Sequence, residues 1–276
     1  MRAAGRSRGT LIGLLVAAVA VACATVPITG RSQVLLFSDQ QVARLADQQH
    51  AKFMAAAREK GVVVTSADAS DARNLDTVHA VGRRIIDAAG LASRYRWEIT
   101  LLRDRTANAS VLPNGKMIVH TGLLPIARND AGLAAVLGHE VGHVIARHSA
   151  ERLSQTMLAQ VGVQVANAAV ALYDPRYQAL TGAALGLGAQ YGVLLPYSRA
   201  HESEADHIGV LLMAKAGYEP AESIALWERM EERGGSRGPE WMSSHPNPGT
   251  RREQLRAWLP EARRYYENRA LPLPIR

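Results

Sequence analysis

Cysteine is nearly absent from the chain, since Cys23 is the only one among 276 residues. A single cysteine excludes an intramolecular disulfide. The formal net charge is +7, but Arg2, Arg6 and Arg8 all lie in the first eight residues, so the remainder is only mildly basic. No cluster of basic residues interleaved with aromatic ones occurs. We therefore do not expect a nucleic-acid partner.

A long apolar run at the N-terminus is also missing. Leu11 to Ala22 is apolar and follows a basic stretch, but it is too short to span a bilayer comfortably. We interpret residues 1–22 as a secretory signal peptide. Cys23 comes directly afterwards, which favours its lipidation as the first residue of a bacterial lipoprotein. The alternative is ordinary cleavage with an incidental cysteine, because Ala20 stands where a lipoprotein signal normally has leucine.

Lipidation of Cys23 would make residues 23–37 an extended arm between a membrane anchor and the folded part. Ala24 stands after the cysteine, where an aspartate retains many lipoproteins in the inner membrane. The sequence therefore predicts a lipid-anchored protein of the periplasm, with the outer membrane favoured. Residues 38–276 show no internal repeat and no clear linker, so we expect one domain.

Helical periodicity predominates, with one short strand region. The patterns predict helices over residues 39–60 and 71–89, a strand over 97–102, and a hairpin of 108–112 and 116–120. Residues 154–195 are rich in alanine, glycine and aliphatic residues. They predict two apolar helices in a hairpin, buried or lid-forming rather than transmembrane, although a membrane-dipping hairpin is the alternative.

The segment from Val136 to Ile145 contains His-Glu-x-x-His within an apolar helical pattern. Positions four apart lie about 40° apart around a helix, so His139 and His143 can bind one metal ion from one face. Glu140 is placed to hold a metal-bound water, as in zinc hydrolases. Two histidines and a glutamate in a buried helix need polar partners, and a zinc ion would satisfy all three.

A zinc site of this kind needs a third protein ligand. The helix-like segment 197–210 offers Glu202, with Asp206 on the same face, where a carboxylate could orient a ligating imidazole. His201 and His207 are rival ligands, because three-histidine zinc sites are common.

These motifs resemble the CaaX-prenyl-protease and HtpX-like zinc metallopeptidase family. The resemblance extends over roughly residues 38–259, and is greatest for the periplasmic, BepA/LoiP-like lipoprotein branch. The matching segments are His139–His143, Ser198–Asp206, Asn108–Gly115 and Ser244–Pro246 followed by Arg251. The resemblance implies a mostly helical α+β fold of the gluzincin type with a small antiparallel sheet.

The resemblance also implies roles for individual residues. His139, His143 and Glu202 would be the ligands of one zinc ion, with Glu140 as the catalytic base. Asp206 would donate a proton or, on a more cautious interpretation, orient a ligand.

His245 corresponds to a histidine near the active site of relatives. It would stabilise the oxyanion or occupy the open zinc position in a latent form, and an ordinary loop histidine is the alternative. An extended substrate would lie against the strand containing Asn108, Val111 and Leu112. Ser110-Val111 and Asn114 depart from the family pattern in this region.

Together these features predict a zinc-dependent endopeptidase of the bacterial envelope. The resemblance implies that its substrates are misfolded or unassembled envelope proteins. The competing hypothesis is a non-catalytic or latent zinc-binding lipoprotein that acts as a chaperone or assembly factor. A third is a zinc amidase acting on cell-wall peptides.

Overall fold

The computed structural model describes residues 23–67, 71–173, 182, 195–234, 245 and 250–275. The signal peptide expected over residues 1–22 lies outside these, as does nearly all of the second helix expected within 154–195. The helices are α2 (Asp39–Glu59), α3 (Ala72–Ala88), α4 (Leu124–Ala127), α5 (Asp130–Ile145), α6 (His148–Tyr173), α8 (Leu195–Lys215), α9 (Glu222–Gly234) and α11 (Arg251–Glu267), with a 3-10 turn at Thr121–Leu123. The strands are β1 (Cys23–Thr25), β2 (Ser32–Val34), β3 (Glu98–Leu102), β4 (Ala109–Val111) and β5 (Lys116–His120). The mostly helical α+β class is therefore confirmed.

The larger sheet has three strands in the order β3-β5-β4. β4 and β5 form the expected antiparallel hairpin, in which Gly115 takes the left-handed conformation (φ 81°) that the turn needs. β3 pairs with β5 in parallel, so the sheet is mixed rather than wholly antiparallel as expected. Because β5 takes the central position, β4 is left at an edge of this sheet.

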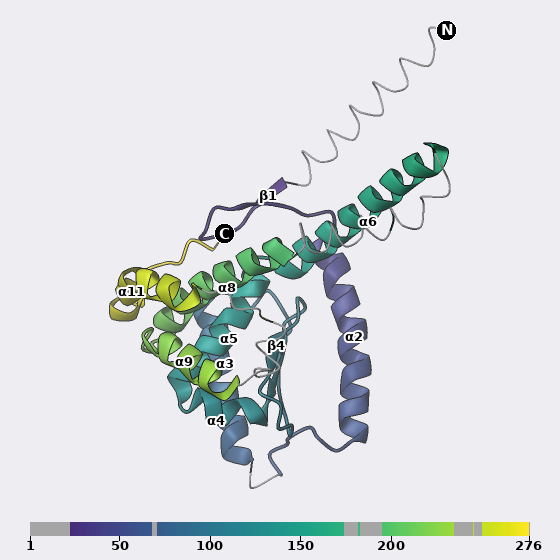
Figure 1. Ribbon diagram of the computed structural model, residues 1–276. Helices are drawn as coiled ribbons and strands as arrows, with labels where there is room; N and C mark the ends of the chain where they lie inside the picture. Colours follow the sequence, from purple (N-terminus) through teal and green to yellow (C-terminus); the bar gives the residue numbers. More distant parts are fainter. Residues whose placement is uncertain are drawn as a thin grey trace.

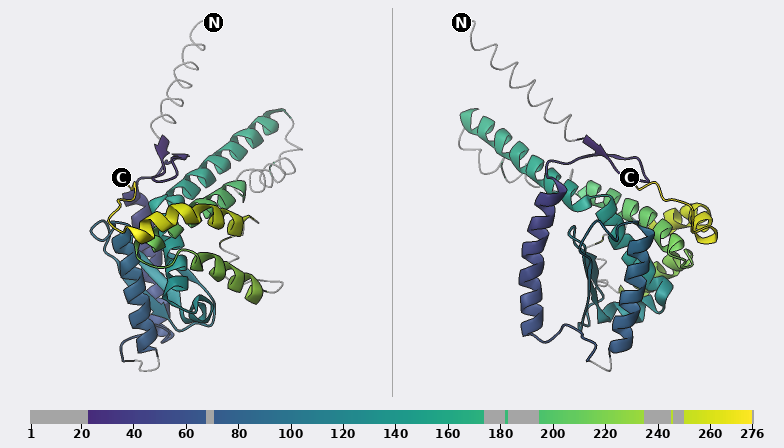
Figure 2. Two further views of the ribbon diagram at one scale, coloured as in Figure 1. Left: turned by 90° about the vertical axis from the view of Figure 1, so that its left-hand side faces the viewer. Right: turned by 180° about the vertical axis from the view of Figure 1, so that it is seen from behind.

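Side chains alternate between two apolar clusters on the two faces of β5. Met117 and Val119 belong to the main core, which the helices α3, α5 and α8 also build. Ile118 points the other way and packs with Ala57 of α2 and Leu102. The sheet therefore lies between α2 and the remaining helices (Figures 1 and 2). The layer of helices on the main-core side holds the His-Glu-x-x-His segment.

The N-terminal arm, residues 23–37, is a short hairpin in place of the simple extended segment expected. β1 and β2 pair antiparallel, with Cys23 opposite Val34. The arm lies along α6 and α8 (Figure 1), and the amide of Leu36 donates a hydrogen bond to Ser154 Oγ of α6 (2.9 Å). It then enters α2 through a capping box on Ser38. The arm is thus tied to the helices near the candidate site.

Helix α6 extends beyond the body of the molecule (Figures 1 and 2). Several of its apolar side chains are exposed, namely Met157, Leu158, Val161 and Val165. Among the described helices, however, none combines the length and the apolar character that a membrane span requires.

Candidate metal centre

Helix α5 carries the His-Glu-x-x-His segment through the centre of the fold. Asn129 caps its N-terminus by accepting a hydrogen bond from the amide of Gly132 (2.8 Å). His139 and Glu140 are buried, with 2% and 3% of their surface exposed. Burying these polar side chains costs free energy unless each has a hydrogen-bond or ionic partner.

Glycines set the distance between α5 and α8. A Cβ on Gly138 would lie 2.7 Å from the carbonyl oxygen of Gly209, and one on Gly142 would lie 2.8 Å from that of Ala205. Only glycine, which has no Cβ, fits at these two positions. The cost of two glycines within a helix is therefore offset by a close crossing of the two backbones. This crossing brings Glu202 of α8 over the histidines of α5.

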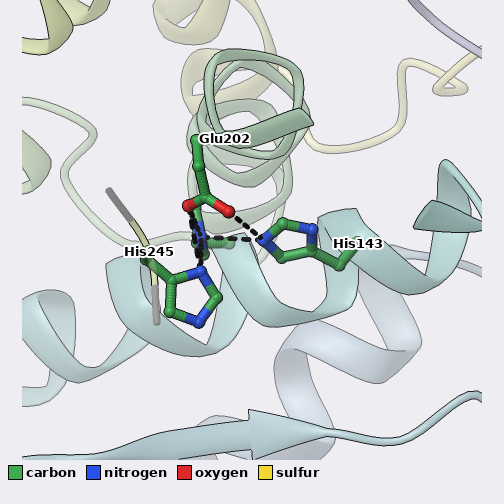
Figure 3. Close-up of side chains that lie close together, drawn as sticks. His143, Glu202 and His245 are labelled. Carbon is green, nitrogen blue, oxygen red and sulfur yellow. Dashed lines mark hydrogen bonds and ion pairs between the residues drawn. The ribbon is translucent and has the colours of Figure 1, made fainter. Parts of the chain in front are cut away.

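The imidazoles of His139 and His143 converge with the carboxylate of Glu202 at the crossing, and Figure 3 shows His143 and Glu202 facing each other there. The Nε2 atoms of His139 and His143 are 3.0 Å apart. Glu202 places Oε2 at 3.3 Å from Nε2 of His139 and Oε1 at 3.5 Å from Nε2 of His143. The structure thus brings together the three residues expected to bind metal, and Glu202 is completely buried.

The chemistry of these donors fits a zinc ion. Nδ1 of His139 lies 2.7 Å from Oδ1 of Asp206, so Asp206 holds the proton on this nitrogen and Nε2 is the nitrogen that faces His143 and Glu202. Among the described residues, Oε1 of Glu202 is buried without a hydrogen-bond partner. A cation bound by the two imidazole nitrogens and the carboxylate would give each of these buried polar atoms a partner.

His245 adds a fourth donor to this group (Figure 3). Its Nδ1 lies 2.9 Å from Oε2 of Glu202 and 3.1 Å from Nε2 of His139. Its Nε2 lies 3.4 Å from Oε1 of Glu140. His245 therefore lies among the expected zinc ligands and beside Glu140.

Asp206 and Glu202 share a buried cation, Arg251 of α11. Arg251 donates from Nε to Oδ2 of Asp206 and from Nη2 to Oε2 of Glu202 (3.2 Å). Its guanidinium also stacks over the ring of Trp227, 3.6 Å from the centroid. The sequence analysis gave Arg251 no role, and its only signal was its place in the matching motif.

Local charges shift the pKa values of the candidate ligands. Burial lowers the pKa of His139, but Asp206 and Glu202 outweigh burial and raise it to about 9. Burial lowers the pKa of His143 well below its ordinary value. Burial raises the pKa of Glu202, yet hydrogen bonds from His139 and His245 hold it far below its ordinary value. Glu202 is therefore ionised, as a metal ligand needs to be.

The rival ligands lie elsewhere. His201 bonds through Nε2 to Glu151 (3.0 Å), and His207 bonds to Glu261 (2.8 Å) at the surface of α8. Neither belongs to the group formed by His139, His143, Glu202 and His245.

The sequence pattern alone predicts that the helix with His139 and His143 continues past His148, which would place His148 on the opposite face as a surface or packing residue. The structure shows that this prediction is wrong. The helix ends at Ile145, and Arg147 adopts a left-handed conformation (φ 58°) before α6 begins. The break turns His148 back toward the site, where its Nδ1 lies 2.7 Å from Nδ1 of His143. Helical geometry could not find this contact, because it assumes that the helix continues.

The expected substrate-contacting residues lie on and beside β4. Val111 is buried in the main core, whereas Asn108 and Leu112 are partly exposed. β4 also packs against α5. A substrate here would use mainly the strand's backbone and the flanking side chains.

A small sheet beside a His-Glu-x-x-His helix, with a glutamate from a second helix, is the arrangement typical of zinc metallopeptidases. A family model described as peptidase family M48 matches residues 72–259, and the chain belongs to this family. Its members use zinc, and the group formed by His139, His143, Glu202 and His245 offers donors that suit this metal.

Three relatives illustrate the range of similar proteins. The mitochondrial metalloendopeptidase OMA1 of Schizosaccharomyces pombe is 41% identical over 187 residues, which are 67% of this chain and 53% of the relative. The human mitochondrial metalloendopeptidase OMA1 is 32% identical over 249 residues, 86% of this chain and 46% of the relative. A putative beta-barrel assembly-enhancing protease of Vibrio cholerae is 30% identical over 189 residues, 65% of this chain and 39% of the relative. The chain spans about half the length of the two OMA1 relatives named here.

Proposed function

We propose that the protein is a zinc-dependent endopeptidase, in which His139, His143 and Glu202 hold the zinc ion and Glu140 is the catalytic base. The convergence of both Nε2 atoms with the buried Glu202 carboxylate carries this proposal. Zinc bound there would polarise a scissile carbonyl and acidify a water molecule.

The chain's own groups supply the remaining functions. Glu140 follows His139 on α5, and its carboxylate takes a proton from water and passes it to the leaving amine. Asp206 holds Nδ1 of His139 and thereby keeps Nε2 available for the metal. Arg251 balances the charge of Asp206 and Glu202.

We propose that the arrangement of His245 corresponds to a latent form. Nδ1 of His245 lies beside Glu202 and His139, so with zinc bound this imidazole would take the position that a catalytic zinc site leaves for water or substrate. Opening the site would then require His245 to withdraw, which also frees Glu140 from its neighbour at 3.4 Å.

The proposed substrate is an unfolded or unassembled protein segment that binds in extended form along β4. Support comes from the sheet order, since β4 pairs only with β5 among the described strands and offers its other edge. An extended peptide can add to such an edge through main-chain hydrogen bonds. Asn108 and Leu112, which flank the strand and are partly exposed, are the side chains placed to contact it.

We further propose that the protein is a periplasmic lipoprotein of the BepA/LoiP-like branch, anchored through Cys23. The support is the basic and apolar segment before Cys23, the exposed position of this cysteine, and the relatives named as beta-barrel assembly-enhancing proteases. The OMA1 relatives are named as mitochondrial, so the location needs its own experiment. Labelling with radioactive palmitate, followed by membrane fractionation, should detect a lipidated protein that Cys23→Ser loses. Equal labelling of both forms would reject the anchor.

Peptidase activity is tested with the purified chain and an unfolded protein such as reduced casein. We expect digestion that stops with a chelator and returns on adding zinc. Digestion unaffected by metal removal would contradict the proposal. Muropeptides serve as the comparison substrate, and their cleavage in preference to casein would favour the cell-wall amidase hypothesis.

The non-catalytic alternative has one observation in its favour, namely the four-donor group that includes His245. Closed four-ligand sites are typical of structural zinc. Complementation in cells separates the two. If Glu140→Gln retains full function while His139→Ala loses it, a chaperone or assembly role replaces proteolysis.

A further inference from the structure

A second group of buried charged residues lies behind the metal centre, between α6, α8 and the N-terminal arm. It contains His148 and Glu151 of α6 with His201 and Glu204 of α8, and each is at most 6% exposed. The rings of His148 and His201 stack with centroids 4.3 Å apart. Buried carboxylates are costly unless they are paired and hydrogen-bonded, so this group has a partner to identify.

Arg31 of the arm is that partner. Its Nη1 and Nη2 donate to both oxygens of Glu151, at 2.7 and 2.6 Å. Its Nε and Nη2 donate to Oε2 of Glu204, at 3.0 and 2.8 Å, and Thr29 of the arm donates to the other oxygen. The two carboxylates hold the pKa of Arg31 above its ordinary value, although burial opposes them. Because Arg31 fills the bidentate position on Glu151, a second metal ion is not needed to explain the group.

The hydrogen bonds run from Arg31 to a proposed zinc ligand. His143 turns Nε2 toward the ligand group, so its Nδ1 carries the proton and donates to Nδ1 of His148 (2.7 Å). His148 then donates from Nε2 to Oε2 of Glu204 (2.9 Å). Arg31 binds the same oxygen of Glu204 and fixes its position. Each hydrogen bond in this series has one donor and one acceptor, so the series sets the tautomer of both imidazoles.

This arrangement differs from that of the other histidine ligand. His139 donates directly to the carboxylate of Asp206, whereas His143 reaches a carboxylate only through a second imidazole. Groups that accept the free N–H of a metal-bound histidine orient its ring and raise its basicity. The orientation of His143 therefore depends on the position of Glu204, and Arg31 holds that position from a different part of the chain.

We propose that Arg31 is a positioning residue for the zinc ligand His143, acting through Glu204 and His148. The N-terminal arm is then a structural part of the metal centre, although the arm contributes no ligand. This inference rests on the proposed zinc site.

The test compares zinc affinity, measured by chelator competition, in the wild type and Arg31→Met. A loss of affinity of about ten- to a hundred-fold is expected, as for other residues that orient metal ligands. Arg31→Lys keeps the charge but loses the paired N–H donors of the guanidinium, so its zinc affinity should lie between those of the wild type and Arg31→Met. Arg256→Met, at an exposed residue 3.7 Å from Glu228, is the matched control and should not change affinity.

Cobalt substitution gives a readout that a general loss of stability would not move. The visible ligand-field bands of the cobalt-loaded protein report the geometry of the ligands, and they should shift in Arg31→Met but not in Arg256→Met. If Arg31→Met does not fold, Glu204→Gln removes the same ionic contact with little change in shape. It should likewise weaken zinc binding and shift the bands.

Two results are kept apart by this design. Wild-type affinity and unchanged bands in a folded Arg31→Met or Glu204→Gln variant would overturn the positioning role while leaving the zinc site intact. Failure of the wild type itself to bind one zinc per chain would reject the proposed function instead.

A double variant of Arg31→Met with His148→Ala should lose no more affinity than His148→Ala alone, because both changes interrupt the same series of hydrogen bonds.

Discussion

The backbones of Gly138 and Gly209 touch where α5 crosses α8, so that a Cβ on Gly138 would lie 2.7 Å from the Gly209 carbonyl oxygen. A methyl group there would force the helices apart. We therefore expect Gly138→Ala to destabilise the protein by about 1–3 kcal/mol, as overpacking does. It should also weaken zinc binding, since Glu202 would move away from the histidines. Denaturant unfolding and zinc titration measure the two effects.

Gly162→Ala is the matched control for this change. Gly162 lies in α6, and nothing among the described residues lies within 4 Å of the position of its added Cβ. Alanine should stabilise this helix by roughly 0.5–1 kcal/mol. Equal effects of the two substitutions would contradict a role for the close crossing.

Glu140→Gln should remove proteolysis and retain the metal. The amide keeps nearly the same shape but accepts no proton, so the rate should fall by about 10²- to 10⁴-fold. Zinc content should stay at the wild-type value, because Glu140 is not among the proposed ligands. Casein digestion and metal analysis on the same preparation check both points. A variant with wild-type digestion would exclude Glu140 as the base.

His245→Ala should raise peptidase activity at saturating zinc, because it removes the imidazole beside Glu202 and His139. It should also speed the loss of zinc to a chelator, since one donor fewer remains. Initial rates on a quenched fluorescent peptide provide the measurement. A fall in rate at full zinc occupancy would show instead that His245 assists the reaction.

Acid should weaken the contact between the arm and α6. Burial raises the pKa of Glu151, but hydrogen bonds from Arg31 and His201 outweigh burial and lower it from 4.5 to about 2. A carboxyl group whose pKa is lower in the folded state stabilises it above the unfolded pKa, and this contribution is lost as pH falls toward the folded pKa. The difference in unfolding free energy between the metal-free wild type and Glu151→Gln should therefore shrink between about pH 4.5 and 2. A difference that stays constant over this range would contradict the ion pair.

Local patterns were enough to predict much of the fold. Ser38 stands before the helix expected from residue 39, and either Asn129 or Asp130 could cap the helix with His139. In the structure Ser38 caps α2, Asn129 caps α5, and β4 and β5 form the expected hairpin. The parallel pairing of β3 with β5 was not predicted, because strand order depends on tertiary packing rather than on periodicity.

In the candidate site too, the local sequence predicted some of the residues, whereas tertiary contacts determine the others. The spacing within α5 brought His139 and His143 together from the sequence, whereas choosing Glu202 over His201 and His207 needed the resemblance to known proteins. Arg31 and His148 escaped prediction for physical reasons. Arg31 lies far from its carboxylates along the chain, and the direction of His148 depends on the left-handed turn at Arg147.

A crystal structure of the zinc-soaked protein, with anomalous data collected at the zinc edge, tests the account most directly. We predict one strong anomalous peak between Nε2 of His139, Nε2 of His143 and the carboxylate of Glu202, at about 2.0–2.2 Å from each. A peak at His148, Glu151 and His201 instead, or no peak among the three proposed ligands, would contradict it.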